Sequence, residues 1–445
     1  MSELKKIRMA AAVLVAALFS VLSVYGQNGA GTSHSPYSIF GPGNLIPEGT
    51  SYNKGMGGAG LAMRNRRTIN LMNPAAVTAR DSLAFMADFS LYQQNRMYRQ
   101  NDLRSASNLT NLNDLAISFP IYRTSAMMVG IAPYSGLGYQ FASYETDPEL
   151  IAQTAAVSKT SQGTGGIYQL FVAGGVTFWK RLSLGAEYIR YFGRIQKTNT
   201  VTFSQSGYNG VSSGFDMSLT ANTAKFGLQY EQPLGHALVL GVGATYKLDA
   251  KLGGSVKDYK ISTGSLVSDT LSFVQNDFSK NAAYLAGEMG VGLTMRQGER
   301  WRAEVDYLTS YWSRSGMENV AGFANVSNGV TFSTVDTRSI RAGFEMTPNA
   351  NDVRYYMRRV AYKAGAYYNK EYFVLNGRQV HSAGITIGAT FPINNQNAKS
   401  GNGLSVSVDL GRRGSPQNSL VRENYINFTV GLSAFDIWFQ KNRYL

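Results

Sequence analysis

The feature that most restricts the fold of this chain is a two-residue alternation of apolar and polar side chains that recurs up to the C-terminal region. Within residues 426–433, Ile, Phe, Val and Leu alternate with Asn, Thr, Gly and Ser. A period of two places each set on its own face of a β-strand. The pattern returns at 404–411 and 238–247 with no helical period between the segments. Such repetition favours a closed sheet, because closure leaves no unpaired edge.

The composition indicates that this sheet lies in a membrane. Beyond the N-terminal leader, no stretch approaches the roughly 18 uninterrupted apolar residues of a membrane-spanning helix. The chain is 12% aromatic and only 16% charged, with 47 Gly. Few charges together with many Gly, Tyr and Phe suit strands with one face in lipid and aromatic residues at both interfaces. We therefore expect an all-β fold, a transmembrane antiparallel β-barrel.

The N-terminus has the pattern of a signal peptide. Basic residues (Lys5, Lys6 and Arg8) precede an uncharged stretch at 9–24, and Val-Tyr-Gly at 24–26 precedes Gln27. The apolar run is shorter than the roughly 20 residues that span a bilayer as a helix. We expect residues 1–26 to be cleaved during export to the outer membrane of a Gram-negative bacterium. The lack of Cys excludes disulfide bonds and a lipidated N-terminal Cys.

Alternating segments predict about fourteen strands, an even number as in bacterial single-chain barrels. They lie near 82–92, 112–123, 125–142, 165–179, 181–203, 214–231, 237–260, 281–297, 300–313, 332–346, 357–372, 379–391, 403–412 and 423–435. Residues 82–445 are therefore the expected barrel. Short links near 180–181, 233–236 and 297–299 are expected at the periplasmic end. Longer links near 143–164, 261–280 and 314–331 are expected outside the cell.

Residues 27–81 show no sustained period and are rich in Gly, Pro, Asn and Arg. A segment of this length without secondary structure is uncommon unless it is functional. We predict that it folds inside the barrel as a plug. Two motifs stand out there: a glycine run with Gly55, Gly57, Gly58 and Gly60, followed by Asn73, Pro74 and Ala75.

With the opening Ser-Pro-Tyr-Ser-Ile-Phe-Gly at 35–41, these motifs and the strand count resemble the outer-membrane long-chain fatty acid and hydrocarbon transporters (FadL and TodX type), in their Bacteroidetes-like form. The motif likeness covers only the plug region. The resemblance implies a monomeric fourteen-stranded barrel that takes hydrophobic ligands from outside and releases them sideways through a kinked third strand. Pro133, Gly136 and Gly138 lie in the third predicted strand and would weaken its pairing. The alternative is a bulge at the rim with no gating role.

Other motifs carry little chemistry. Gly55–Gly60 matches G-x-G-x-x-G, but no strand precedes it, so close backbone packing explains it better than a dinucleotide. G-x-S-x-G at 210–214 lacks the strand-turn-helix context of a nucleophile. Three scattered histidines (His34, His236 and His381) and no Cys give no metal ligand set. We expect no enzyme activity, no cofactor and no metal.

The formal net charge of +14 favours anionic neighbours. Because the basic residues are scattered, lipopolysaccharide and membrane lipid are expected partners and nucleic acid is not. Charges of both signs fall on the lumen face, where a salt-bridge network is the simpler interpretation. The functional alternative is that some basic residues bind the carboxylate of an amphipathic ligand. The candidates are Arg64, Arg66, Arg67, Arg302, Arg341 and Lys363.

The leading functional hypothesis is transport of hydrophobic or amphipathic small molecules by capture in the lumen and lateral release. Apolar residues in two long loops favour hydrophobic capture: Leu266, Val267, Leu271, Phe273 and Val274, and Val320, Phe323 and Val326. The alternative is a barrel subunit of a secretion or surface-attachment machine. A polar porin or an enzyme are lesser alternatives. In each case the barrel assembly machinery of the outer membrane is an expected partner.

Overall fold

The computed structural model describes residues 33–80, 84–205, 207–264, 268–277, 283–320, 322–323, 332–393, 402–415 and 420–437. The expected signal peptide lies outside these residues, as do residues 27–32 of the expected plug and its boundary with the barrel at 81–82. No helix in the described part of the chain is long and apolar enough to cross a membrane.

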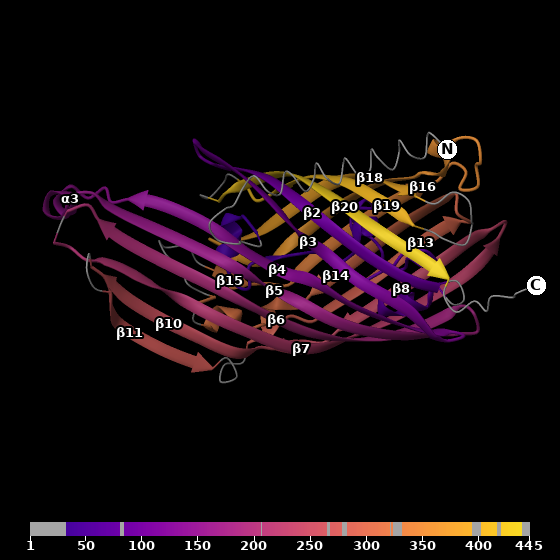
Figure 1. Cartoon of the computed structure of the whole chain (residues 1–445), viewed down its shortest axis with the longest axis horizontal. Helices are drawn as coiled ribbons and strands as arrows, with labels where there is room; N and C mark the ends of the chain where they lie inside the picture. The colour runs from indigo at the N-terminus through magenta and orange to yellow at the C-terminus, as the bar shows by residue number, and fades with distance from the viewer. Residues whose placement is uncertain are drawn as a thin grey trace, which may run out of the picture.

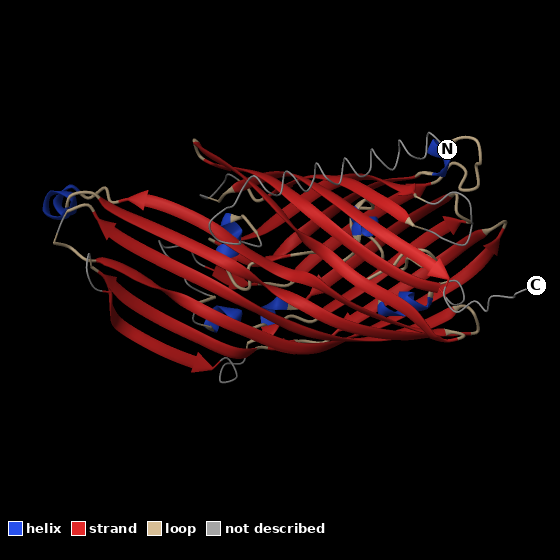
Figure 2. Ribbon diagram, viewed as in Figure 1, coloured by secondary structure: helices blue, strands red, loops and turns tan. Residues whose placement is uncertain are grey.

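Eighteen strand segments in the described part of the chain form one antiparallel sheet (Figures 1 and 2). Four segments are additions: β1 (Asn44–Leu45), β10 (Gly253–Thr263), β11 (Ser268–Asp277) and β15 (Phe332–Thr334). The other fourteen form the wall, which confirms the predicted barrel. They are β2 (Ala84–Gln100), β3 (Leu103–Tyr122), β4 (Ser125–Tyr144), β5 (Val157–Phe178), β6 (Leu182–Phe203), β7 (Gly210–Gly235), β8 (Leu238–Lys247), β13 (Glu288–Gln297), β14 (Trp301–Ser310), β16 (Thr337–Met346), β17 (Ala361–Leu375), β18 (Arg378–Pro392), β19 (Gly403–Arg413) and β20 (Arg422–Ile437).

The barrel closes between its first and last wall strands, since β2 pairs with both β3 and β20. The predicted faces of β20 are correct. Ile426, Phe428 and Leu432 are exposed on the outer face, whereas Thr429 and Ser433 are buried on the inner face. Apolar side chains therefore meet lipid, and small polar side chains line the interior.

The strands on one side of the wall extend further at one end of the barrel, which we call the tall end. The strands β4–β7 are each 20 to 26 residues long, while β13, β14 and β16 have 10 each. The hairpin of β10 and β11 continues this extension, and the helix α3 (Pro148–Thr154) caps it at the left of Figure 1. Much of the loop expected at 143–164 is therefore strand. Residues 93–100 and 103–111, which were not predicted as strand, belong to β2 and β3. Their side chains are mostly polar, so no apolar alternation marks them.

The N-terminal segment (residues 33–80) contains four short elements. They are the 3₁₀-helices η1 (Pro36–Ile39) and η2 (Pro74–Thr78), the strand β1 and the α-helix α2 (Ser51–Lys54). Side chains at two helix starts accept backbone amides, Ser35 from Tyr37 and Asn73 from Ala75. The elements contact separate parts of the wall: η1 contacts β4, η2 contacts β5 to β7, and α2 contacts β18 to β20. The segment therefore packs against the inner face of the wall on several sides, and its short helices lie among the strands in Figure 2.

Loops at the tall end join the segment in an apolar core. The remaining elements there are β9 (Ala250–Lys251), which pairs with β12 (Tyr284–Leu285), and the 3₁₀-helices η4 (Trp312–Arg314) and η5 (Met317–Asn319). Phe40 stacks on Phe332 with ring centroids 5.3 Å apart. Val320 and Phe323 are buried in this core. Their sequence position suggested an open capture surface, but these two side chains are not part of one. Leu266, Val267 and Val326 lie outside the described residues.

Candidate functional site

The glycine run of the N-terminal segment is attached to the wall through its backbone. The amide of Gly60 donates to Asp306 Oδ2 at 2.7 Å, and the amide of Ala62 donates to Glu304 Oε1 at 2.9 Å. Both carboxylates come from β14, where alternate residues point inward. The sequence analysis placed charges of both signs on the lumen face but could not say which backbone groups the acids bind.

The glycines are needed where the segment approaches the wall closely. Gly57 has φ +68°, and a Cβ there would lie 2.8 Å from the carbonyl oxygens of Ala342 and Ala366. A side chain would therefore clash and be strained at once. Gly58 also has a positive φ, and Gly55 and Gly60 face wall or segment side chains at short range. The G-x-G-x-x-G match is thus a packing motif in this structure.

The Asn-Pro-Ala motif shapes the turn that follows. Asn73 Oδ1 accepts from the amide of Ala75 at 3.0 Å, which starts η2, and Pro74 takes the first helical position. The Asn73 amide donates to the carbonyls of Leu61 at 2.8 Å and Leu228 at 3.2 Å. One side chain therefore joins the glycine run, η2 and the strand β7.

The sequence analysis missed a partly buried ion pair between the N-terminal segment and the wall. Glu48 of the N-terminal segment lies 2.5 Å from Lys225 Nζ and 3.8 Å from Lys247 Nζ. Burial alone would raise the pKa of the Glu48 carboxyl, but the two ammonium groups outweigh it and lower the pKa to about 2. Glu48 and Lys225 are separated by 177 positions. No local pattern marks such a pair.

The six cationic candidates do not form one site. Arg341 lines the lumen cavity described below. Arg302 donates to Tyr52 and to the carbonyl of Arg64, while Lys363 lies 3.1 Å from the centre of the Tyr52 ring. Both side chains therefore contact the N-terminal segment, and Lys363 also lies 3.8 Å from Glu345 of the wall.

The other three candidates lie toward the end of the segment that leads into β2. Arg64 pairs with Glu231 at 3.5 Å and donates to Gln229 at 3.1 Å. Arg67 is exposed and 4.0 Å from Glu299, and Arg66 is exposed as well. Arg64 and Arg67 thus take part in ion pairs, and ligand binding by the six candidates stays a prediction.

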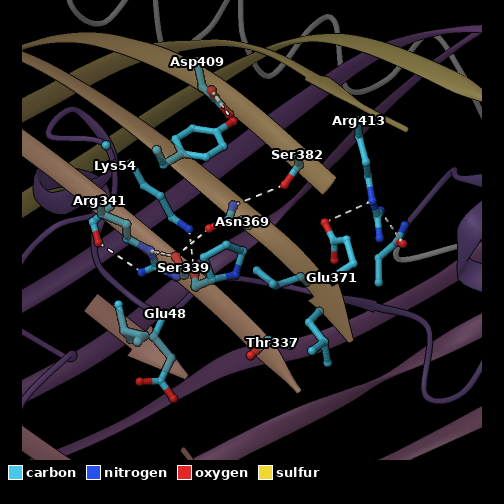
Figure 3. A pocket seen from close by; sticks show the side chains of 18 of the residues that line it. Glu48, Lys54, Thr337, Ser339, Arg341, Asn369, Glu371, Ser382, Asp409 and Arg413 are labelled. Atoms are coloured by element: carbon cyan, nitrogen blue, oxygen red, sulfur yellow. Dashed lines mark hydrogen bonds and ion pairs between the residues drawn. The ribbon is translucent and has the colours of Figure 1, made fainter. Parts of the chain in front are cut away.

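A cavity of about 280 Å³ lies between the N-terminal segment and the wall. Its lining is mixed, with many polar and charged groups (Figure 3). The lining includes Glu48, Lys54, Tyr92, Arg341, Asn369 and Asp409. Such a lining suits a polar or amphipathic group better than a purely hydrocarbon one.

Two neighbouring cations, Lys54 and Arg341, face this cavity (Figure 3). Lys54 Nζ donates to the carbonyl of Pro47 at 2.7 Å. Burial and the nearby Arg341 guanidinium lower the pKa of Lys54 to about 8. Arg341 donates to Gly58 O and to Ser339 Oγ, both at 3.1 Å, as Figure 3 shows. Each cation keeps donors in excess of these partners, so both could bind an anionic head group.

The wall is not continuously paired between β3 and β4. Their pairing runs from Tyr122 and Ser125 to Leu115 and Ile131 and goes no further within these two fully described strands. Beyond it, β3 (103–114) pairs with β2, and β4 (132–144) pairs with β5. We call this unpaired stretch the β3–β4 seam. The two strands diverge toward the tall end in Figure 1.

Pro133, Gly136 and Gly138 all lie on the β4 side of the seam, and a bulge interrupts the ladder with β5 just after Pro133. The N-terminal segment occupies the free edge of β4. Asn44 pairs with Gly136, and the amide of Ser35 donates to Gly138 O at 2.9 Å. Gly138 has no room for a Cβ, because that position is filled by the backbone of the segment. The sequence showed the weak strand but not the segment that pairs with it.

These features define a class: a fourteen-stranded outer-membrane barrel with the fold of the FadL-type hydrocarbon transporters. A family model described as BamG matches residues 4–445, so the chain belongs to the BamG family. No curated protein matches it. The Bacteroidetes-like form of the predicted resemblance stays a prediction.

Solved structures support the fold. The toluene transporter TbuX of Ralstonia pickettii is 14% identical with a TM-score of 0.57, covering 90% of this chain and 99% of that one. The toluene transporter TodX of Pseudomonas putida is 15% identical, with a TM-score of 0.56 and coverage of 90% and 100%. A Pseudomonas aeruginosa FadL homologue is 12% identical, with a TM-score of 0.52 and coverage of 89% and 100%. At these identities the likeness concerns the fold.

Proposed function

We propose that this protein transports hydrophobic or amphipathic small molecules across the outer membrane and releases them sideways at the β3–β4 seam. The seam is the observation that carries the proposal. It is the stretch where two neighbouring wall strands lack a ladder and where the two-residue strand β1 of the N-terminal segment, rather than a wall strand, covers the edge of β4. The solved toluene transporters of the same fold support the substrate class.

The cavity favours an amphipathic ligand over a pure hydrocarbon. Lys54 and Arg341 would hold an anionic head, while the seam would give the apolar tail a path into the bilayer. A lateral exit is physically favourable, because each CH₂ moved into water costs about 0.8 kcal/mol. The N-terminal segment must leave the edge of β4 for this path to open.

A reversible disulfide tests this movement. Leu45 and Ser135 are direct partners in the β1–β4 pair. Antiparallel partners have Cα atoms about 4.5–5.5 Å apart, within the range of a disulfide. The chain has no Cys, so L45C/S135C introduces one defined bond. Oxidised cells should lose uptake of a labelled long-chain fatty acid, and a reducing agent should restore it.

The matched control joins β3 to β4 where these two strands are already paired, with F119C/M127C. This disulfide should leave uptake unchanged in both redox states. Uptake that persists in oxidised L45C/S135C at equal surface abundance would reject the lateral exit. If the parent protein supports no uptake, transport itself is wrong.

A second candidate is a barrel subunit of a secretion or surface-attachment machine. The specific observation is β11, whose residues 269–276 pair with β10 alone in the described part of the chain. Leu271, Phe273 and Val274 are exposed on it, well beyond the lipid-facing band. An exposed apolar edge strand can add a strand from another polypeptide. A photo-crosslinking residue at Phe273 should then capture one defined protein in intact cells, whereas a transporter acting alone should give no such product.

A further inference from the structure

The loop between β16 and β17 (residues 347–360) differs from the neighbouring turns at its end of the barrel. The turns at 179–181, 236–237 and 298–300 on the same end have two or three residues. The loop is longer and contains the turn η6 (Tyr356–Arg359). Short turns mark the periplasmic end of a bacterial barrel, so the loop lies at the inner leaflet of the membrane.

This loop is well ordered despite its length. Asp352 Oδ1 accepts the amides of Arg354 at 2.9 Å and Tyr355 at 2.7 Å. The amide of Asn349 donates to the carbonyl of Arg358 at 2.8 Å, which closes the base of the loop. The side chains at its tip are therefore presented in a fixed arrangement.

The tip of the loop leaves apolar side chains exposed. Val353 is 96% exposed, Met357 59% and Tyr355 49%. The hydroxyl of Tyr362, on the lipid face of β17, donates to the carbonyl of Met357 at 3.1 Å. Tyr362 pairs with Met346, which is also exposed on the lipid face. The apolar tip thus continues the lipid-facing surface of the wall.

Arginines surround this apolar tip. Arg354 and Arg358 lie over the Tyr355 ring at 5.3 and 4.9 Å, and Arg359 lies 4.9 Å from the Tyr356 ring. The one carboxylate of the loop, Asp352, pairs with Arg358 at 3.3 Å. The loop therefore keeps an excess of positive charge next to apolar side chains.

We propose that loop 347–360 is a binding site for an anionic phospholipid of the inner leaflet. Arg354, Arg358 and Arg359 bind its phosphate, and Val353 and Met357 lie among its acyl chains. Basic residues near an anionic bilayer surface bind its phosphates, and exposed apolar side chains beside them insert at the acyl boundary. Continuity with the lipid face of the wall favours lipid over a periplasmic protein as the occupant.

The test is titration of the full-length protein in detergent with phosphatidylglycerol, with bound lipid counted by native mass spectrometry. Arg354→Gln is the informative variant, because the Arg354 side chain contacts the Tyr355 ring without joining the hydrogen bonds that order the loop. It should weaken binding about five-fold, the ratio expected for one basic residue near an anionic surface. R354Q/R358Q should weaken it about 25-fold on the same basis.

The control, R123Q/R181Q, removes the same charge from two short turns at the same end of the barrel. It should leave phosphatidylglycerol binding unchanged. Phosphatidylcholine should bind the parent protein more weakly than phosphatidylglycerol, and Met357→Ser should weaken both. Equal losses in R354Q/R358Q and R123Q/R181Q would overturn the proposal, as general charge would then explain binding. If no phospholipid binds, the exposed tip is a protein contact and the proposal is wrong.

Discussion

Replacing Glu48 with Gln should release the N-terminal segment from the wall. The change keeps the side-chain size but removes the negative charge between Lys225 and Lys247. The Lys225 side chain is 2% exposed, and it would keep only the more weakly coupled Glu187 as a counter-charge. Breaking a fully buried pair costs about 3–5 kcal/mol, and the remaining Glu187 places this pair near the lower end of that range. The equilibrium between the docked and released segment should therefore shift by roughly two orders of magnitude.

Single-channel conductance in planar bilayers measures this shift directly. The parent protein should stay closed, and E48Q should show frequent openings. E145Q is the matched control, because Glu145 pairs with Lys159 at 2.5 Å at the exposed tall end and should not affect closure. E48Q/K225Q should recover much of the closed state, since it also removes the uncompensated charge. E48Q channels as closed as the parent would refute Glu48 as an anchor of the segment.

Two further substitutions test packing and the faces of the wall. Gly57→Ala should also open the channel in the same conductance assay, because its Cβ would lie 2.8 Å from two wall carbonyls. Gly174→Ala is the control and should leave the channel closed, because its Cβ would meet only one atom, at 3.9 Å. Val430→Arg should lower outer-membrane abundance, since Arg at the lipid midplane costs about 2–4 kcal/mol. Thr429→Arg points into the lumen and should be better tolerated; equal abundance of the two variants would contradict the assigned faces.

The wall could be predicted from sequence because lipid on one side and a polar interior on the other impose a period of two. The prediction was weakest where that contrast ends. Residues 93–100 and 103–111 continue β2 and β3 with mostly polar side chains, so they looked like a loop. The apolar Val320 and Phe323 looked like a surface for ligand capture, but they are buried against the N-terminal segment.

The candidate site was predicted only in part. Gly57 and Asn73 stood out because close packing and helix starts depend on local residue type. Glu48 and the strand β1 did not stand out, because their partners are remote in sequence and the residues themselves look like those of an ordinary loop. Arg302 and Lys363 show the converse case. Their charge suggested a ligand, yet what they bind is Tyr52 of the same chain.

The order of segments along the chain has a consequence for how the protein folds. The N-terminal segment precedes every wall strand, yet it contacts strands from β4 to β20, and the barrel closes only when β20 reaches β2. Such remote contacts give a high contact order and slow folding. The wall must therefore assemble around a segment that is synthesised first. A truncation that removes residues 33–80 would not yield an open pore of the same shape, because β14, β16 and β17 would then close without the surface on which their inner side chains pack.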